Sequence, residues 1–464
     1  MEQVKKGKYE TDLTVGPILK KLIIYALPLI GINLLQLLFS TADIVVLGMF
    51  AEDSDNAVAA VGATTPIINL LINLFLGLSI GANVLVSRCV GQKNLNDSRK
   101  LVGTAICSSL LFGLGVLLVG FFGARTFMVW TNCDPQAIDK ATTYLKIYFL
   151  GMPIIMLYNF SASILRAVGD TFRPFIYLII GGVVNVFLNI FFIVVLGMNV
   201  EGVAIATVTS QGISALLACI ALIKSDGFSK IERKHCRVRK KELIAIFKIG
   251  APVGIAKCLF AISNVFLQSA INELGTDVMA AHSIGHQIDA FINEALSAIS
   301  LATLSFISQN VGARDTKRVK NTIIISLFLI ALTSVIIGGV ILPLAPYLCD
   351  IMTDSEEIIK LSCERIYIMG FSYVLCGTMC VLQEVLRGLG KSFMSMIISL
   401  IGSCVLRIIY INTIYHLFGT HEMIYIIYPI TWAITALMFV WPIIVAYRKL
   451  KQINNEPKKE AIYE

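Results

Sequence analysis

The stretch that decides the fold runs from Leu22 to Phe50 and reads LIIYALPLIGINLLQLLFSTADIVVLGMF. It is apolar throughout except for a few polar residues and one charge, Asp43. The stretch is long enough for an α-helix to cross a hydrocarbon core of about 30 Å. A carboxylate at membrane depth costs roughly 2.5–3.5 kcal/mol on insertion scales, so Asp43 is expected to have a function or a partner.

Composition places the whole chain in the same class. Of 464 residues, 56% are hydrophobic and 15% are charged, and the mean hydropathy is +0.80. Soluble domains carry about 25% charged residues. We therefore predict an all-α membrane protein with about twelve transmembrane helices. The expected spans are 20–50, 57–86, 101–123, 142–165, 174–197, 202–223, 243–271, 279–308, 321–343, 361–386, 394–418 and 424–447.

The charged residues predict the orientation of these spans. Basic residues gather in alternate connections, most densely between Lys224 and Lys248, whereas the other connections carry mostly acids such as Asp53 and Glu201. Because basic residues stay on the cytoplasmic side, we predict a multi-pass protein of the cell (inner) membrane with both termini in the cytoplasm. The same bias explains the net charge of +8, so no nucleic-acid partner is expected.

The chain contains an internal repeat with a shift of 221 residues. Residues 87–91 (SRCVG) then meet 308–312 (SQNVG), and 165–169 (LRAVG) meet 386–390 (LRGLG). A proline interrupts each half near its start, at Pro28 and at Pro252. We predict an N-lobe of six spans (1–224), a cytoplasmic linker (225–242), and a C-lobe of six spans with a short cytoplasmic tail (243–464). Parallel halves of this kind suit a transporter that works by alternating access.

A candidate cation site lies in the first half. Asp43, Asn189 and Thr207 each fall about 10 Å below the predicted outer surface. Asn185 is one turn deeper on the face of Asn189, and Gln36 is two turns below Asp43. A carboxylate, amide oxygens and a hydroxyl can hold a proton or ligate a small cation. The alternative is that the amides and the hydroxyl only join helices by hydrogen bonds.

The second half has its own buried charges. Lys257, Asp289, Glu294 and Arg407 each fall near the middle of a span, where an unpaired charge is costly. They either line a substrate cavity, together with His286, or form a structural ion-pair cluster. His282 and His286 share a helix face, but no further ligands accompany them, so no metal site is expected. No Walker motif is present, so ATP coupling is not expected, and the glycines of 76–81 indicate close helix packing.

The repeat, the two prolines, the Ala42-Asp43-Ile44 motif and the Leu-Arg-Ala/Gly motifs resemble the multidrug and toxic-compound extrusion (MATE) family. The resemblance covers nearly the whole chain and implies a V-shaped two-lobe antiporter, driven by H⁺ or Na⁺, that exports small organic, often cationic, drugs or toxic compounds. It places the N-lobe cation site at Asp43, Asn185, Asn189 and Thr207. Many members carry a second Asp where this chain has Asn189, so this lobe keeps one carboxylate there.

We therefore predict a secondary active transporter rather than an enzyme. No cofactor is expected beyond the coupling ion, and a small organic substrate and the lipid bilayer are the expected partners of a monomer. A flippase for lipid-linked precursors would share the two-lobe fold, but its cavity would be dominated by cations. An intramembrane enzyme would need a nucleophile–base or metal pair at one depth, for which His282 and His286 are the candidates.

Overall fold

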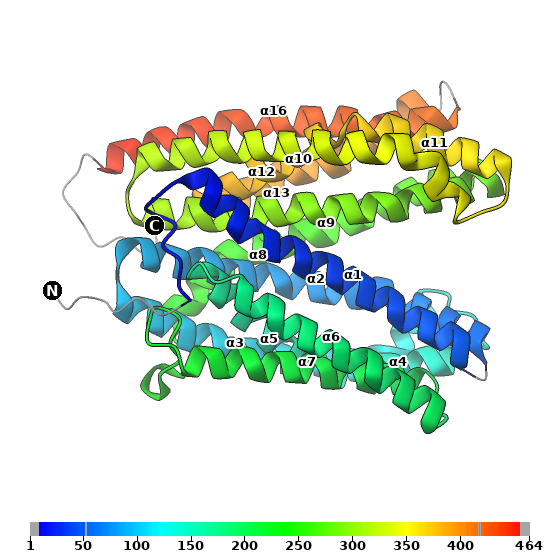
Figure 1. Ribbon diagram of the computed structural model, residues 1–464, viewed down its shortest axis with the longest axis horizontal. Helices are drawn as coiled ribbons and strands as arrows, with labels where there is room; N and C mark the ends of the chain where they lie inside the picture. Colours follow the sequence, from blue (N-terminus) through cyan, green and yellow to red (C-terminus); the bar gives the residue numbers. More distant parts are fainter. Residues whose placement is uncertain (1–8, 52, 416, 418, 455–464) are drawn as a thin grey trace. The chain divides into compact units, whose positions relative to one another are not determined.

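The computed structural model describes residues 9–51, 53–415, 417 and 419–454, and this part of the chain is helical with short connections (Figure 1). The first half contains α1 (Ile18–Phe50), α2 (Ser54–Gln92), α3 (Leu95–Trp130), α4 (Ile138–Leu150), α5 (Met152–Ala167), α6 (Phe172–Ile190), η1 (Phe191–Val195) and α7 (Val200–Ile223). A short turn of helix, η2 (Arg233–His235), follows in the connection to the second half. The second half contains α8 (Lys240–Asn272), α9 (Thr276–Gly312), α10 (Thr316–Asp350), α11 (Glu356–Gly370), α12 (Tyr373–Gly388), α13 (Ser392–Leu400), η3 (Ile401–Val405), α14 (Leu406–Tyr410), η4 (Ile411–Tyr415) and α16 (His421–Asn454).

Length and apolarity confirm the predicted membrane class. Within the described residues, ten helices are long and apolar enough to cross a membrane, and two bent helix pairs bring the number to twelve. These pairs are α4–α5, bent by 50°, and α11–α12, bent by 49°, where the sequence predicted one span over 142–165 and one over 361–386. Gly151 and Pro153 lie at the first bend, and a proline there cannot continue the hydrogen bonding of a helix. The second bend occurs without a proline.

The sequence repeat is also a repeat of backbone structure. Adding 221 to the bounds of α5, Met152–Ala167, gives 373–388, which are the bounds of α12. The same shift takes η1 at 191–195 to within one residue of η4 at 411–415, and both are short π-helical segments. Both halves also carry the bent pair described above. Local sequence in each half therefore encodes the same series of helices, bends and π-turns.

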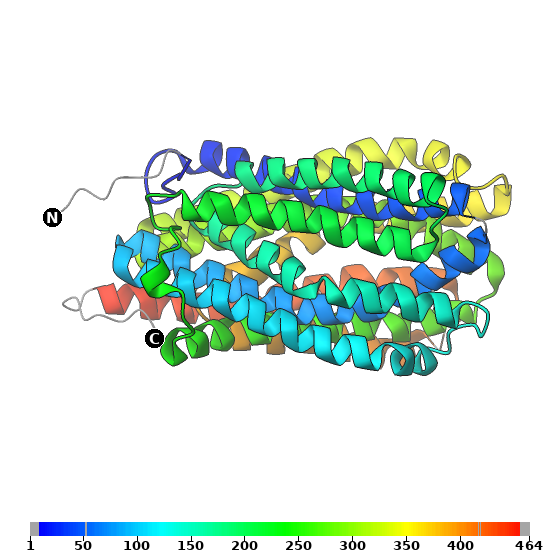
Figure 2. The ribbon, with the colours of Figure 1, turned by 90° about the horizontal axis from the view of Figure 1, so that it is seen from below.

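Two compact units emerge from the contacts, and their boundaries fall inside helices. Among the described residues, unit 1 contains Gly31–Gly254, and unit 2 contains Leu13–Ile30 and the residues that follow Gly254, as far as residue 454. The first boundary lies just after Pro28 in α1, and the second just after Pro252 in α8. In unit 1, α6 runs beside α7 and α3 beside α5 (Figures 1 and 2). In unit 2, α9 packs against α10, α11 and α12.

Glycines bring α2 and the first part of α8 into backbone contact within unit 1. A Cβ on Gly81 would lie 2.5 Å from the Ile246 carbonyl oxygen, and one on Gly250 would lie 2.6 Å from Leu78 Cα. A Cβ on Gly77 would overlap the backbone of Gly254. The structure thus confirms the close helix packing that the glycines of 76–81 predicted.

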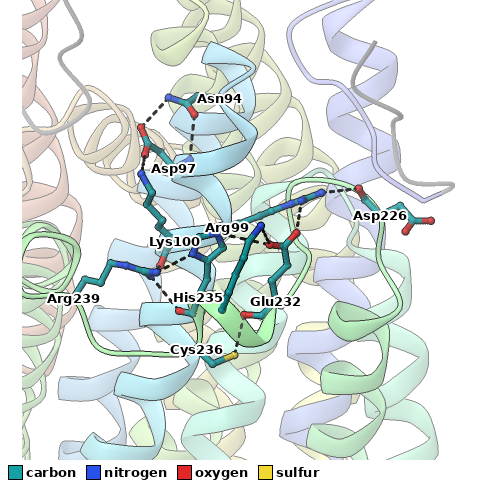
Figure 3. A network of polar contacts seen from close by, with 10 residues as sticks. Asn94, Asp97, Arg99, Lys100, Asp226, Glu232, His235, Cys236 and Arg239 are labelled. Carbon is teal, nitrogen blue, oxygen red and sulfur yellow. Dashed lines mark hydrogen bonds and ion pairs between the residues drawn. The ribbon is translucent and has the colours of Figure 1, made fainter. Parts of the chain in front are cut away.

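The connection between the halves is docked on unit 1 by polar contacts (Figure 3). Arg99 of α3 pairs with Glu232, and its Nη2 donates to the Asp226 carbonyl at 3.3 Å. Arg239 Nη2 lies 2.8 Å from His235 Nδ1. Because arginine only donates, Nδ1 accepts this bond and the proton of neutral His235 lies on Nε2. Gly103 permits the contact, since a Cβ there would overlap the carbonyl of His235.

Candidate functional site

The four residues predicted for the first-half cation site form one hydrogen-bonded cluster in unit 1. Asn189 Nδ2 donates to Asp43 Oδ1 at 2.5 Å, and Thr207 Oγ1 donates to Asp43 Oδ2 at 3.3 Å. Asn189 Nδ2 also lies 3.3 Å from Asn185 Oδ1, and Asn185 Nδ2 donates to Thr207 Oγ1 at 3.4 Å. The cluster therefore joins α1, α6 and α7 around a single carboxylate.

Helical spacing explains why the two asparagines meet Asp43 together. Asn185 and Asn189 are four residues apart on α6, which places both on one face. Both are buried, with 4% and 0% of their surface exposed. Gln36 differs from them: its side chain is exposed, and its backbone carbonyl accepts a hydrogen bond from Ser40 Oγ at 3.0 Å. The structure thus brings four of the five predicted residues together, and Gln36 is not among them.

The donors around Asp43 are neutral, and this decides what the site can do. Among the described side chains, no Lys, Arg or His forms an ion pair with Asp43. A carboxylate in a low-dielectric interior without a counter-ion favours binding a proton or a cation. Asn189 Oδ1 is buried and has no partner within the described residues. A half-turn of this amide replaces Nδ2 by Oδ1, which can accept from a protonated Asp43 or ligate a cation.

Two tyrosines near this cluster were missed by the sequence reasoning. Tyr144 and Tyr148 of α4 are close enough to Asp43 to interact with its charge. They are four residues apart, and their rings stack with centroids 6.1 Å apart. Two tyrosines four residues apart are common on the packed face of a helix, so nothing in the sequence singled these two out. Both rings lie on α4, which the 50° bend separates from α5.

The charges predicted for the second half have different partners within unit 2. Asp289 Oδ2 accepts from Arg365 Nη2 at 2.6 Å, and its Oδ1 accepts from the Tyr373 hydroxyl. Glu294 instead lies within the electrostatic influence of Lys257. Arg407 Nη1 donates to Asn264 Oδ1 at 3.2 Å. Asp289 and Arg407 thus have their hydrogen-bond partners among other side chains, and Arg365 and Tyr373 are members of this region that the sequence reasoning missed.

The two histidines of α9 differ in their surroundings. His282 is buried and stacks on Tyr425, with ring centroids 6.2 Å apart and an interplanar angle of 14°. His286 is exposed on the next turn, 6.1 Å from His282 by ring centroids. Elsewhere in unit 2, Glu364, His421 and Glu422 hold their possible ligand atoms within 4.8 Å of one another. His421 of this group and His282 of the pair lie beside the same ring, Tyr425, at 6.1 and 6.2 Å between centroids.

Comparisons with known proteins agree with this architecture. The MatE family matches residues 28–191 and again 252–413, one match for each half of the chain. The probable multidrug resistance protein YoeA of Bacillus subtilis is 25% identical over 390 residues, which cover 81% of this chain and 82% of that protein. The multidrug export protein MepA of Staphylococcus aureus is 22% identical over 406 residues, which cover 87% and 89%.

Solved structures share the fold. A MATE protein crystallised in the bent conformation superposes with a TM-score of 0.89 at 20% identity, covering 96% of this chain and 98% of that one. A multidrug resistance MATE family transporter of the MOP superfamily, in the outward-facing conformation, gives a TM-score of 0.87 at 21% identity and covers 95% and 98%. With the family matched over both halves, the chain belongs to the MATE family: it is a multi-pass membrane transporter of small molecules and not an enzyme.

Proposed function

We propose that this protein exports small organic compounds, often cationic, by alternating access and draws its energy from an inward flow of H⁺ or Na⁺. The observation that carries the proposal is the Asp43 cluster, a membrane-buried carboxylate that accepts hydrogen bonds from Asn189 and Thr207. The described residues supply neutral donors there and no counter-ion. The relatives' names, multidrug resistance and multidrug export proteins, support the substrate class.

Coupling in this scheme runs through Asp43. The loaded carboxylate, bearing H⁺ or Na⁺, is electrically neutral, whereas the unloaded one is charged. The difference in charge changes how strongly Asp43 binds the amide groups of α6 and the hydroxyl of α7. Ion binding therefore alters the contacts that join α1 to α6 and α7, which is the differential interaction that a conformational change requires.

The proposal also includes the membrane location, the orientation and the oligomeric state of the transporter. The basic bias of alternate connections supports cytoplasmic termini and a place in the cell membrane. The chain then acts as a monomer without ATP, because each copy carries both halves and the energy comes from the ion gradient. Apart from the substrate, the coupling ion is the only group that the proposed cycle has to bind.

The test is transport by the purified full-length protein in proteoliposomes. Vesicles receive a fluorescent organic cation and then, in separate experiments, an H⁺ gradient or a Na⁺ gradient of equal size. We expect dye movement against its own concentration gradient under at least one of the two, and its loss when an ionophore dissipates that gradient. Dye movement that ignores both gradients would contradict cation coupling. Movement that requires ATP would contradict secondary transport.

A further inference from the structure

Three arginines are almost completely buried in unit 2, and one of them differs from the others. Arg365, Arg387 and Arg407 expose 1%, 3% and 1% of their surface. Arg365 pairs with Asp289, and Arg387 pairs with Glu384. Arg407 has no carboxylate partner anywhere in the described part of the chain. A buried cation of this kind is expensive unless something else compensates its charge.

The hydrogen bonds of Arg407 leave one particular edge of the guanidinium without partners. Nη1 donates to Asn264 Oδ1 at 3.2 Å. Nε and Nη2 are buried and have no hydrogen-bond partner within residues 9–51, 53–415, 417 and 419–454. The N–H groups of Nε and Nη2 point the same way, because they lie on one side of the planar group. This edge is the fork that binds both oxygens of a carboxylate at once.

Aromatic rings compensate part of the charge without using that edge. The Arg407 Cζ atom lies 4.7 Å from the ring centroid of Tyr428 and 5.2 Å from that of Phe260. A cation–π contact is an attraction between the charge and the face of a ring, so it does not use the N–H groups as hydrogen-bond donors. The rings therefore make the buried charge tolerable while the two donors remain available for an acceptor.

The backbone around Arg407 is equally unusual. Arg407 lies in α14, a five-residue helix between the π-helical segments η3 and η4. Short π-helical segments occur frequently at functional sites. Nε and Nη2 are closed to solvent in this structure. A ligand can therefore reach them only after neighbouring side chains move. Alternating access involves such movements around the substrate site.

We propose that Arg407 is a substrate-specificity residue that binds an acidic group, above all a carboxylate, through its Nε–Nη2 edge. The inference rests on the proposed export function and names a substrate class within it: compounds with an acidic group beside an aromatic or cationic body. Asp289 does not take this place: its hydrogen bonds in the described part of the chain are to Arg365 and Tyr373. Tyr428 and Phe260 then offer ring surface to the body of the compound.

The test uses two dyes that differ in the acidic group alone: rhodamine B, which carries a carboxylate, and its ethyl ester. Binding to the purified full-length protein is measured by fluorescence anisotropy in detergent, where no ion gradient exists. We expect the acid to bind about tenfold more tightly than the ester, as a hydrogen-bonded charge pair provides. In Arg407→Met the acid should lose about tenfold in affinity, and the ester should change less than about twofold.

Two further variants separate this role from a structural one. Arg407→Lys keeps the charge but loses the fork, so it should restore only part of the preference for the acid. Lys391→Met removes an exposed positive charge of the same unit and should leave the preference intact. Equal affinity of the wild-type protein for the two dyes overturns the proposal, and so does an unchanged preference in Arg407→Met. Because binding is read without a gradient, failure of gradient-driven export would overturn the proposed function and leave this result standing.

Discussion

Asn189 Nδ2 donates a hydrogen bond of 2.5 Å to Asp43 Oδ1 and so ties α6 to the acid of α1. The contact joins residues that are 146 positions apart in sequence. In this contact the NH2 group of the Asn189 amide, and not its oxygen, faces the Asp43 carboxylate. An N–H donor suits the ionised acid, whereas the amide oxygen can accept from a protonated acid or ligate a bound cation. Under the proposed coupling, we therefore expect the contact between Asn189 and Asp43 to differ between the ionised and the loaded acid.

Replacing Asp43 by Asn should abolish coupling. Asp43→Asn keeps the size of the side chain and removes the group that exchanges H⁺ or Na⁺, so efflux against a gradient should fall at least about tenfold. Transport in proteoliposomes measures it, with folded yield checked by size-exclusion chromatography. The control is Asp139→Asn, which removes an acid that is largely exposed. Wild-type efflux in Asp43→Asn at normal yield would exclude Asp43 from the coupling mechanism.

The Asn189 position should tune the ion. Asn189→Asp places a second carboxylate at hydrogen-bonding distance from Asp43, and two like charges so close favour keeping one proton or cation between them. We expect the dependence of efflux on pH or on Na⁺ to shift, while Asp43→Asn in the same background remains inactive. Efflux is measured across a pH series at fixed Na⁺ and across a Na⁺ series at fixed pH. Two unchanged profiles would mean that position 189 takes no part in ion binding.

The contact between α2 and α8 should not tolerate a methyl group. In Gly77→Ala the new Cβ would overlap the backbone of Gly254, which cannot rotate away. Overpacking of this kind costs about 1–3 kcal/mol of unfolding free energy. Thermal unfolding in detergent should show a lower midpoint. Gly62→Ala in the same helix is the matched control, since a Cβ there meets nothing within 4 Å, and equal midpoints for the two variants would contradict the prediction.

The buried pair of Arg365 and Asp289 should behave as one unit. Arg365→Met leaves the Asp289 carboxylate buried without its cation, and breaking such a pair costs about 3–5 kcal/mol. Adding Asp289→Asn removes the stranded charge but keeps an oxygen that accepts from Tyr373. Folded yield in the membrane should therefore drop in the single variant and recover in the double one. A double variant as poor as Arg365→Met would show that packing, rather than the charge, governs this site.

Acid should loosen the connection between the halves. Burial, together with the charge of Arg239, lowers the pKa of His235 from its ordinary value of 6.5. His235 therefore binds a proton less readily when the connection is docked than when it is released. The free energy that favours the docked connection falls as the pH drops below about 6.5. Hydrogen exchange over residues 226–239, corrected for intrinsic rates, should speed up between pH 7 and pH 5.5 relative to α3. His235→Gln should lose this dependence, and slower corrected exchange at pH 5.5 would reverse the expected sign.

The sequence by itself determined the class of fold and much of the first-half site. Uninterrupted apolar stretches leave helices as the way to satisfy backbone hydrogen bonds in a membrane, so the number of spans follows from composition. The 221-residue shift showed the internal repeat, since equal sequence signals produce equal helices. Asp43 was recognisable because a single acid in an apolar span is costly. The positions of Asn185, Asn189 and Thr207 followed from depth along their helices.

Only the tertiary structure decided which side chains meet. Depth and helix face leave the rotation of each helix open, so they could not show that the side chain of Gln36 is exposed while Asn185 and Asn189 are buried, or that Tyr144 and Tyr148 lie near Asp43. The partner of Asp289 proved to be Arg365, a residue near a helix bend that apolar periodicity does not predict. Membrane sequences specify helices through local hydrogen bonding and hydrophobicity. The pairing of buried charges depends on packing between distant segments, and no local pattern encodes it.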